Sequence, residues 1–251
     1  MIAFVLILLM QIPLGSTAPA PSALDQADLA FKNRNDPKQA LQALALYREL
    51  YRGTEQVEKK SELSWRLAAA CYFVGFRITE DASEKEKLFA EGRDAALECL
   101  KSSDRVECHF WAAINMALYG KEAGIFKMFF SLGTIREHLK KVIALDPTYM
   151  AAGAFRIEGK IEEALPGILG GSYDRAKEYY IQAISHGPNE PLNYLFLAIL
   201  YKEQFDNPKE AIKIARQGLA LPPPPPQQIE SIEARDKLKK FLETELRLSS
   251  D

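Results

Sequence analysis

Apolar side chains recur at helical spacing along almost the whole chain. Within residues 36–51, Leu41, Leu44, Tyr47 and Leu50 lie three or six positions apart, so one face of the predicted helix is apolar. No stretch of any length alternates apolar and polar residues in the way a half-buried strand does. The pattern therefore predicts an all-α fold.

The stretch LPGILGGSYDRAKEYYIQAISHGP, residues 165–188, shows how the predicted helices are organised. Pro166 ends one helix, and Ser172 follows a Gly170-Gly171 loop as the predicted N-cap of the next. If Gly171 requires a positive φ angle, replacing it with valine should destabilise this unit. Small and large residues then follow at the spacing of the second helix of a tetratricopeptide repeat.

The remaining helices repeat this unit. Residues 36–221 divide into about five helix pairs, which we expect to stack into a right-handed superhelix of tetratricopeptide-like hairpins. Asp36-Pro37 and Asn207-Pro208 each supply an N-cap followed by a first-turn proline. The residues assigned to packing within and between repeats are Trp65, Ala68, Tyr72, Gly159, Ala176, Tyr180, Ala183, Pro188, Ala198, Tyr201, Ala211 and Gly218.

Both ends of the chain differ from the repeats. Residues 1–20 resemble a secretory signal, with an apolar run and an Ala18-x-Ala20 pair; an uncleaved anchor or a misassigned start codon are the alternatives. Residues 21–35 form a polar lead-in. Residues 222–227 are a polyproline linker, and residues 228–248 a helix that caps the last repeat, or alternatively binds a partner.

An apolar insert at residues 124–132 interrupts the third helix pair. Such a segment either folds over the repeat core or marks contact with a partner or a membrane. Its large apolar residues include Ile125, Phe126, Met128, Phe129 and Phe130.

The first helices of stacked repeats line a concave groove, and residues one helical step from the packing positions face into it. Arginine in such a groove suits a carboxylate, so a small organic anion or an acidic peptide is a candidate ligand. Ordinary solvated charges are the alternative. The predicted groove residues are Arg66, Phe73, His109, Met116, Tyr119, Arg156 and Lys160.

Composition and motifs argue for binding rather than catalysis. The formal net charge of −2 and the lack of a basic stripe argue against a nucleic-acid partner. The histidines His109, His138 and His186 are dispersed, and no phosphate-binding glycine loop occurs, so we predict no enzyme, no metal and no cofactor. Cys99 and Cys108 flank a turn and can pair in an oxidising compartment.

Two long segments resemble a known family. YGKEAGIFKMFFSLGTIREHLKKVIALDPTY and ALPGILGGSYDRAKEYYIQAISHGP are similar to the tetratricopeptide-type T component (TatT-like) of bacterial TRAP transporters. The resemblance covers about residues 60–245 and is strongest over 111–220. It implies a periplasmic helical-repeat protein that associates with a transporter's substrate-binding protein and that can form homo-oligomers. No cysteine for lipid attachment lies near residues 1–20.

The sequence therefore predicts an exported, non-catalytic helical-repeat scaffold. Its expected partner is a periplasmic substrate-binding protein, on the resemblance alone. Direct binding of a small organic anion in the groove, and a purely structural role in the bacterial envelope, are the two alternatives.

Overall fold

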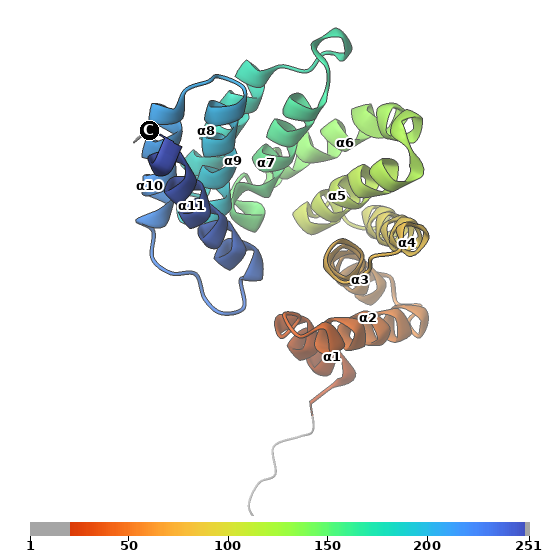
Figure 1. Cartoon of the computed structure of the whole chain (residues 1–251). Helices are drawn as coiled ribbons and strands as arrows, with labels where there is room; N and C mark the ends of the chain where they lie inside the picture. Colours follow the sequence, from red (N-terminus) through yellow and green to blue (C-terminus); the bar gives the residue numbers. More distant parts are fainter. Residues whose placement is uncertain (1–20, 249–251) are drawn as a thin grey trace, which may run out of the picture.

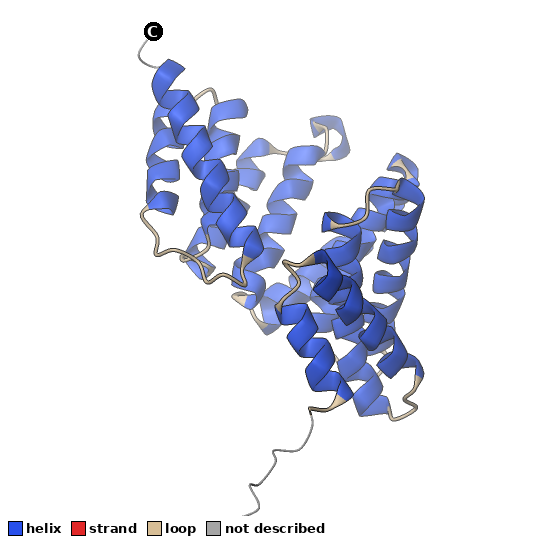
Figure 2. Cartoon of the chain, turned by 60° about the horizontal axis from the view of Figure 1, so that its bottom comes forward, coloured by secondary structure: helices blue, strands red, loops and turns tan. Residues whose placement is uncertain are grey.

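The computed structural model describes residues 21–248, and it confirms the all-α helical-repeat fold. Eleven α-helices occur in this part of the chain, and no strand does (Figures 1 and 2). Five hairpins follow one another and an eleventh helix closes the series. The hairpins are α1 (Ala23–Lys32) with α2 (Pro37–Arg52), α3 (Val57–Arg77) with α4 (Ala82–Leu100), α5 (Val106–Ala123) with α6 (Ile125–Leu145), α7 (Tyr149–Ala164) with α8 (Tyr173–His186), and α9 (Pro191–Glu203) with α10 (Pro208–Leu219); α11 spans Ile229–Leu248.

The polar lead-in expected at residues 21–35 is wrong, because this segment contains α1. Ser22 caps α1 through a reciprocal capping box with Asp25. Ala27 and Ala30 are buried against α2, so the first hairpin begins at α1. The helix is only ten residues long, and its fully buried positions are alanines, with Leu24 and Phe31 partly buried beside them, which weakens the sequence signal.

The caps predicted at the other helix starts are present. The side chains of Asp36, Ser172 and Asn207 each accept a hydrogen bond from a backbone N–H in the first turn that follows. Each cap satisfies one of the donors that a helix start leaves without an intrahelical partner. Local sequence therefore fixes where α2, α8 and α10 begin.

The loop between α7 and α8 corrects the expectation for Gly171. The residue with positive φ is Gly170, at 87°. Gly171 needs to be glycine for a different reason: a Cβ there would lie 1.8 Å from the carbonyl oxygen of Leu165. Close approach of two backbone segments, rather than backbone conformation, excludes a side chain at this position.

Small residues let the helices of a hairpin approach each other. A Cβ on Gly159 would lie 2.3 Å from the ring of Tyr180, and one on Gly218 would lie 2.7 Å from Tyr194. The alanines of the repeat-packing set, which are Ala68, Ala176, Ala183, Ala198 and Ala211, are fully buried. Trp65, Tyr72 and Tyr201 are partly buried, Tyr180 is fully buried, and Pro188 is exposed after α8.

The apolar core consists of two main clusters. One runs from α1 to α7 and the other from α8 to α11, with a small cluster of Ala152, Phe155 and Ala183 at the junction. A disulfide joins Cys99 at the end of α4 to Cys108 in α5. Cys71 is buried as a free thiol, and burial raises its pKa well above the usual value, which keeps it in the unreactive thiol form.

The superhelix closes on itself through α11. This helix packs along α9 and α10, and its first turn returns to the N-terminal hairpins, as Figure 1 shows. The Asn35 side-chain amide donates to the carbonyl oxygen of Pro226 at 2.8 Å, across 191 positions of sequence. Arg77 at the end of α3 pairs with Glu233 of α11. Residues at opposite ends of the chain therefore meet.

Candidate functional site

Three of the predicted groove residues lie in the core. Phe73, His109 and Met116 are only 3%, 6% and 8% exposed. Phe73 nevertheless lines a cleft that is described below. The helices of a repeat bury a wider face than the packing positions alone indicate, because they contact both their own partner and the next hairpin.

Three further predicted residues are engaged with neighbours on their own or adjacent helices. Arg66 pairs with Asp28 of α1 at 3.0 Å and with Glu62 one turn earlier. Lys160 pairs with Glu163 at 3.0 Å and lies 5.0 Å from the ring centroid of Phe196. The Tyr119 ring lies beneath the guanidinium of Arg93 from α4. The structure does not bring these three side chains together.

Arg156 lies at the inner surface, where it holds an unusual turn. Met150, Ala151 and Ala152 have φ angles of 49°, 51° and 65°, in the left-handed region. Their carbonyl groups cannot join the right-handed hydrogen-bond ladder, and Arg156 donates to those of Met150 and Ala151. It also donates to Asn193 of α9 at 2.7 Å. Burial lowers the pKa of Arg156, with Glu190 acting in the opposite direction.

Two of the dispersed histidines meet between α5 and α6. The Nδ1 atoms of His109 and His138 are 2.8 Å apart, and His109 Nε2 lies 2.6 Å from Asp104 Oδ1. Lys141 is 3.5 Å from the same carboxylate. Burial, and secondarily the neighbouring His109, lower the pKa of His138. The cluster ties the α4–α5 loop to α6.

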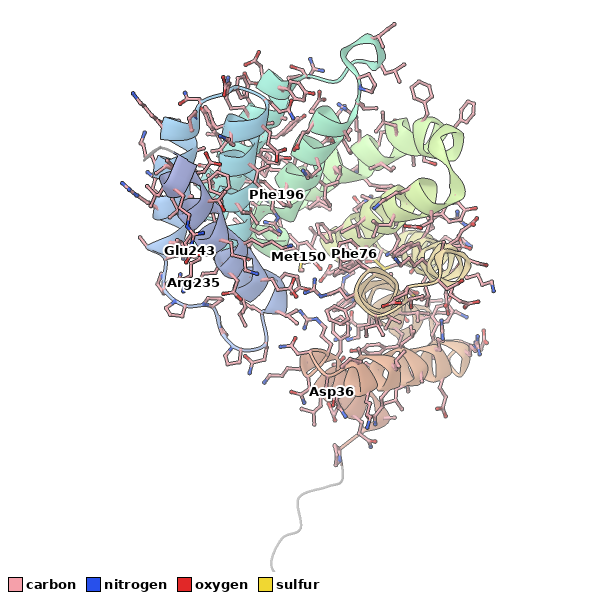
Figure 3. All side chains as sticks on the ribbon, in the orientation of Figure 1. Asp36, Phe76, Met150, Phe196, Arg235 and Glu243 are labelled. Atoms are coloured by element: carbon pink, nitrogen blue, oxygen red, sulfur yellow. A yellow bond between two sulfur atoms is a disulfide. The ribbon has the colours of Figure 1, made fainter. Side chains whose placement is uncertain are left out.

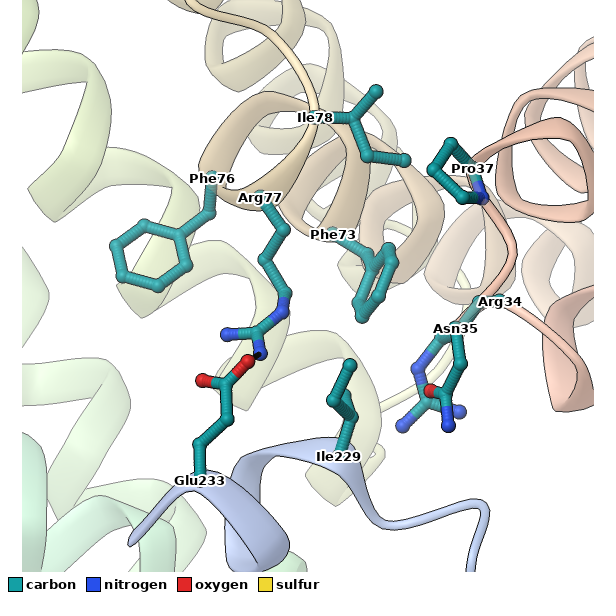
Figure 4. A pocket seen from close by; sticks show the side chains of 9 residues that line it. All are labelled: Arg34, Asn35, Pro37, Phe73, Phe76, Arg77, Ile78, Ile229 and Glu233. Atoms are coloured by element: carbon teal, nitrogen blue, oxygen red, sulfur yellow. Dashed lines mark hydrogen bonds and ion pairs between the residues drawn. The ribbon is translucent and has the colours of Figure 1, made fainter. Parts of the chain in front are cut away.

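The inner surface has a different set of charged residues at its centre. They come from the α1–α2 loop, the end of α3 and the first turn of α11, and they surround a cleft of about 360 Å³ (Figure 4). We call this the α3–α11 cleft, and its main lining residues are Arg34, Phe73, Phe76, Arg77, Ile229 and Glu233. Arg77 pairs with Glu233, and Arg34 lies 3.6 Å from Glu230.

Tyr72 belongs to the same surroundings. Burial raises the pKa of Tyr72 to about 12, and the negative charge of Glu230 acts in the same direction, whereas Arg77, Arg156 and Arg34 oppose it. The tyrosine is therefore protonated at neutral pH. Its ring stacks on Phe76, with centroids 5.7 Å apart and planes at 8°.

Apolar side chains are exposed beside these charges. Phe76 and Met150 are 49% and 45% exposed, and Figure 3 places both near the middle of the superhelix, with Phe196 farther along the inner surface. Exposed apolar residues next to arginine are typical of protein-binding surfaces. The arrangement can hold a partner by burying an apolar side chain between charged groups.

The insert predicted at residues 124–132 forms the start of α6. Phe129 and Phe130 are 49% and 83% exposed, whereas Leu132 packs against the larger core cluster. The side chains of Ile125, Phe126 and Met128 lie outside the described residues. Ile168 in the α7–α8 loop is likewise exposed, at 94%.

Sequence reasoning named Phe73 of the α3–α11 cleft but missed the charged residues around it. Arg77 and Glu233 are 156 positions apart, and each by itself is an ordinary charge at a helix end. The Pro-rich segment before Ile229 was the available signal, because it indicates that α11 departs from the repeat pattern. It does not indicate which surface the helix reaches.

Fold and surface define a helical-repeat protein with a binding surface on its inside. Residues 23–245 match the model of the family described as regulator of microtubule dynamics protein 1–3. The match extends from the first residue of α1 into the last turns of α11. The chain belongs to this family.

Individual relatives carry the same description. Regulator of microtubule dynamics protein 3 of Bos taurus is 29% identical over 209 residues, which are 76% of this chain and 43% of the relative. The protein 3 of Xenopus laevis is 37% identical over 87 residues, 34% of this chain and 19% of its own length. Regulator of microtubule dynamics protein 1 of Pongo abelii is 29% identical over 133 residues, which are 53% of this chain and 40% of the relative. The chain spans less than half the length of these curated relatives.

The family assignment corrects the expectations that came from the TRAP transporter resemblance. The chain is not a T component, and neither a periplasmic location nor a role beside a transporter is supported. The motif LPGILGG encodes a helix stop and a tight loop, and Ser172 directly after it is the cap of the next helix; these requirements arise from hairpin geometry rather than from transport. The expected substrate-binding protein and organic anion are likewise unsupported as partners. None of the helices in residues 21–248 is long and apolar enough to span a membrane.

Proposed function

We propose that this chain is a non-catalytic, protein-binding repeat domain that takes part in regulating microtubule dynamics. The observation that carries the proposal is the extent of the family match, which includes every helix from α1 to α11. The repeat domain is thus the part that the chain shares with relatives named for this regulation.

The inner surface supports binding rather than chemical conversion. Arg77 and Arg34 are engaged with carboxylates, and Arg156 with carbonyl and amide oxygens. The exposed side chains beside them, Phe76 and Met150, are apolar. Such a surface holds a protein segment through apolar burial with charged groups around it.

Microtubule assembly tests the proposal directly. Purified chain is added to tubulin, assembly is followed by light scattering, and the polymer is sedimented to measure bound chain. We expect a changed assembly rate and co-sedimentation, both reduced by Phe76→Ala with Met150→Ala. Leu41→Ala is the matched control, because Leu41 on α2 is also 49% exposed. Unchanged assembly together with no co-sedimentation would reject a direct action on microtubules.

A further inference from the structure

The α3–α11 cleft has the features of a peptide-binding site. Its floor is Phe73, and two guanidinium groups lie over that ring: Arg34 at 5.2 Å and Arg77 at 5.8 Å from the centroid. Arg34 also lies 5.0 Å from the ring of Phe31. Contact with aromatic faces fixes the orientation of each guanidinium, so its donors are held ready for a carboxylate.

The chain itself shows what the cleft binds. The first turn of α11 places Ile229 between the two arginines, as Figure 4 shows, while Glu230 and Glu233 meet Arg34 and Arg77. One apolar residue followed by acidic residues one and four positions later therefore fits the cleft. Asn35 adds a contact to the backbone just before this turn, at Pro226.

The two sides of the contact differ in how firmly they are held. The arginine side chains are 19% and 15% exposed, whereas those of Glu230 and Glu233 are 33% and 44% exposed. Ion pairs that are partly exposed to water are individually weak. The arginines thus belong to the body of the protein, and the first turn of α11 is the more exposed side of these ion pairs. Ser231 of this turn is buried and donates a hydrogen bond to Glu190 at 2.7 Å, which release of the turn would have to break.

The remainder of α11 is anchored elsewhere. Leu238 and Leu242 are buried in the core cluster formed with α9 and α10. Glu245 pairs with Lys202 at 2.9 Å, and Arg235 donates to the carbonyl oxygen of Leu221. Release of the first turn therefore leaves the helix in place and opens the cleft.

We infer that the α3–α11 cleft is a docking site for an acidic, amphipathic helical segment of a partner protein, and that the first turn of α11 occupies it in the absence of that partner. The inference rests on the proposed function only in that the partner is a protein. Charge complementarity identifies the segment: two carboxylates three positions apart and an apolar residue directly before the first.

A fluorescent peptide of residues 224–236, PPPQQIESIEARD, tests the site on the full chain. In the Glu230→Gln, Glu233→Gln chain the cleft loses its own carboxylates, so we expect the peptide to bind at least tenfold more tightly than to wild type. Glu243→Gln on the exposed side of α11 is the control and should bind as wild type does. Equal binding to all three chains would overturn the inference, as would equal binding of a peptide carrying the same two glutamines.

Charge reversal keeps the test valid if an arginine variant loses stability. Arg77→Glu in the Glu230→Gln, Glu233→Gln chain should reject the acidic peptide and bind the peptide with Glu233→Arg, which a misfolded chain cannot do. Light scattering at increasing protein concentration measures whether the chain forms a dimer. A dimer that Arg77→Glu abolishes would show that a second copy of the chain occupies the cleft, and it would overturn the inference of a separate partner protein. Peptide binding needs no tubulin, so it succeeds or fails independently of the microtubule assay.

Discussion

At the residue scale, single backbone contacts explain several positions better than residue type does. Gly171 is glycine because the Leu165 carbonyl leaves no room for a Cβ, although its neighbour Gly170 has the left-handed conformation. Arg156 is arginine because three oxygen acceptors converge on its guanidinium. Neither reason is visible in the local sequence, which showed only a glycine-rich loop and a charge.

Gly171→Ala should therefore destabilise the fold by about 2 kcal/mol or more, since the backbone must move to accept the methyl group. Gly167→Ala in the same loop is the control, because a Cβ at Gly167 meets no atom within 4 Å. Chemical denaturation of both variants measures the free energy of unfolding. Equal stability of the two variants contradicts the predicted clash.

The histidine pair predicts a pH effect on stability. Burial and His109 hold the pKa of His138 below its ordinary value of 6.5, so the folded state favours the neutral ring. The unfolded chain takes up the proton first as pH falls. Stability should therefore be greatest above about pH 6.5 and should decrease as the pH falls through the lower folded-state pKa.

Thermal unfolding between pH 5 and pH 8 measures this dependence. His138→Gln, which has no titrating ring, should flatten the decrease in Tm below pH 6.5. His186→Gln is the matched control, since His186 stacks on Phe155 and lies outside the pair. If Tm decreases equally steeply below pH 6.5 in both variants, other titrating groups cause the pH dependence.

At the element scale, α7 shows where periodicity fails to describe a helix. Its apolar pattern continues through its start, but residues 150–152 are left-handed. Each L-residue in that conformation costs about 1–2 kcal/mol, and contacts with Arg156 and with α9 offset part of that cost. The turn lies at the junction of the two core clusters, where the chain passes from one set of hairpins to the other.

Ala151→Gly should raise the free energy of unfolding by about 0.5–1 kcal/mol. Glycine adopts a φ of 51° without steric cost, and this gain exceeds the added entropy of the unfolded chain. Ala154→Gly, in the regular part of α7, should instead lower stability by about 1 kcal/mol. Denaturant titration compares the two, and a loss of stability in both argues against the left-handed turn.

At the scale of the whole molecule, the first turn of α11 joins the two ends of the superhelix. The rest of α11 is held by apolar packing, whereas this turn is held by two ion pairs, the Asn35 contact to Pro226, a hydrogen bond from Ser231 to Glu190 and packing of Ile229. Closure is therefore sensitive to charge, and we expect loss of the two ion pairs to open the inner surface at this turn.

Hydrogen exchange should detect this opening. In Glu230→Gln, Glu233→Gln we expect faster exchange of the amides of residues 231–234 and unchanged exchange of residues 238–246. The reason is that only the first turn loses its partners, while Leu238 and Leu242 stay buried. Faster exchange along all of α11 would show that the helix is released as one unit, contrary to the prediction.

The sequence by itself determined the all-α fold, the starts of α2, α8 and α10 and the hairpin repeat, but not α1. Helical periodicity, caps such as Asp36 and Ser172, and small residues facing large ones act over a few positions or within one hairpin. Only the tertiary structure decided the inner surface. Closure depends on the rotation accumulated over five hairpins, which brings Arg77 to Glu233 and Asn35 to Pro226 across 156 and 191 positions. No local sequence pattern encodes the total rotation, because each hairpin contributes only a small part of it.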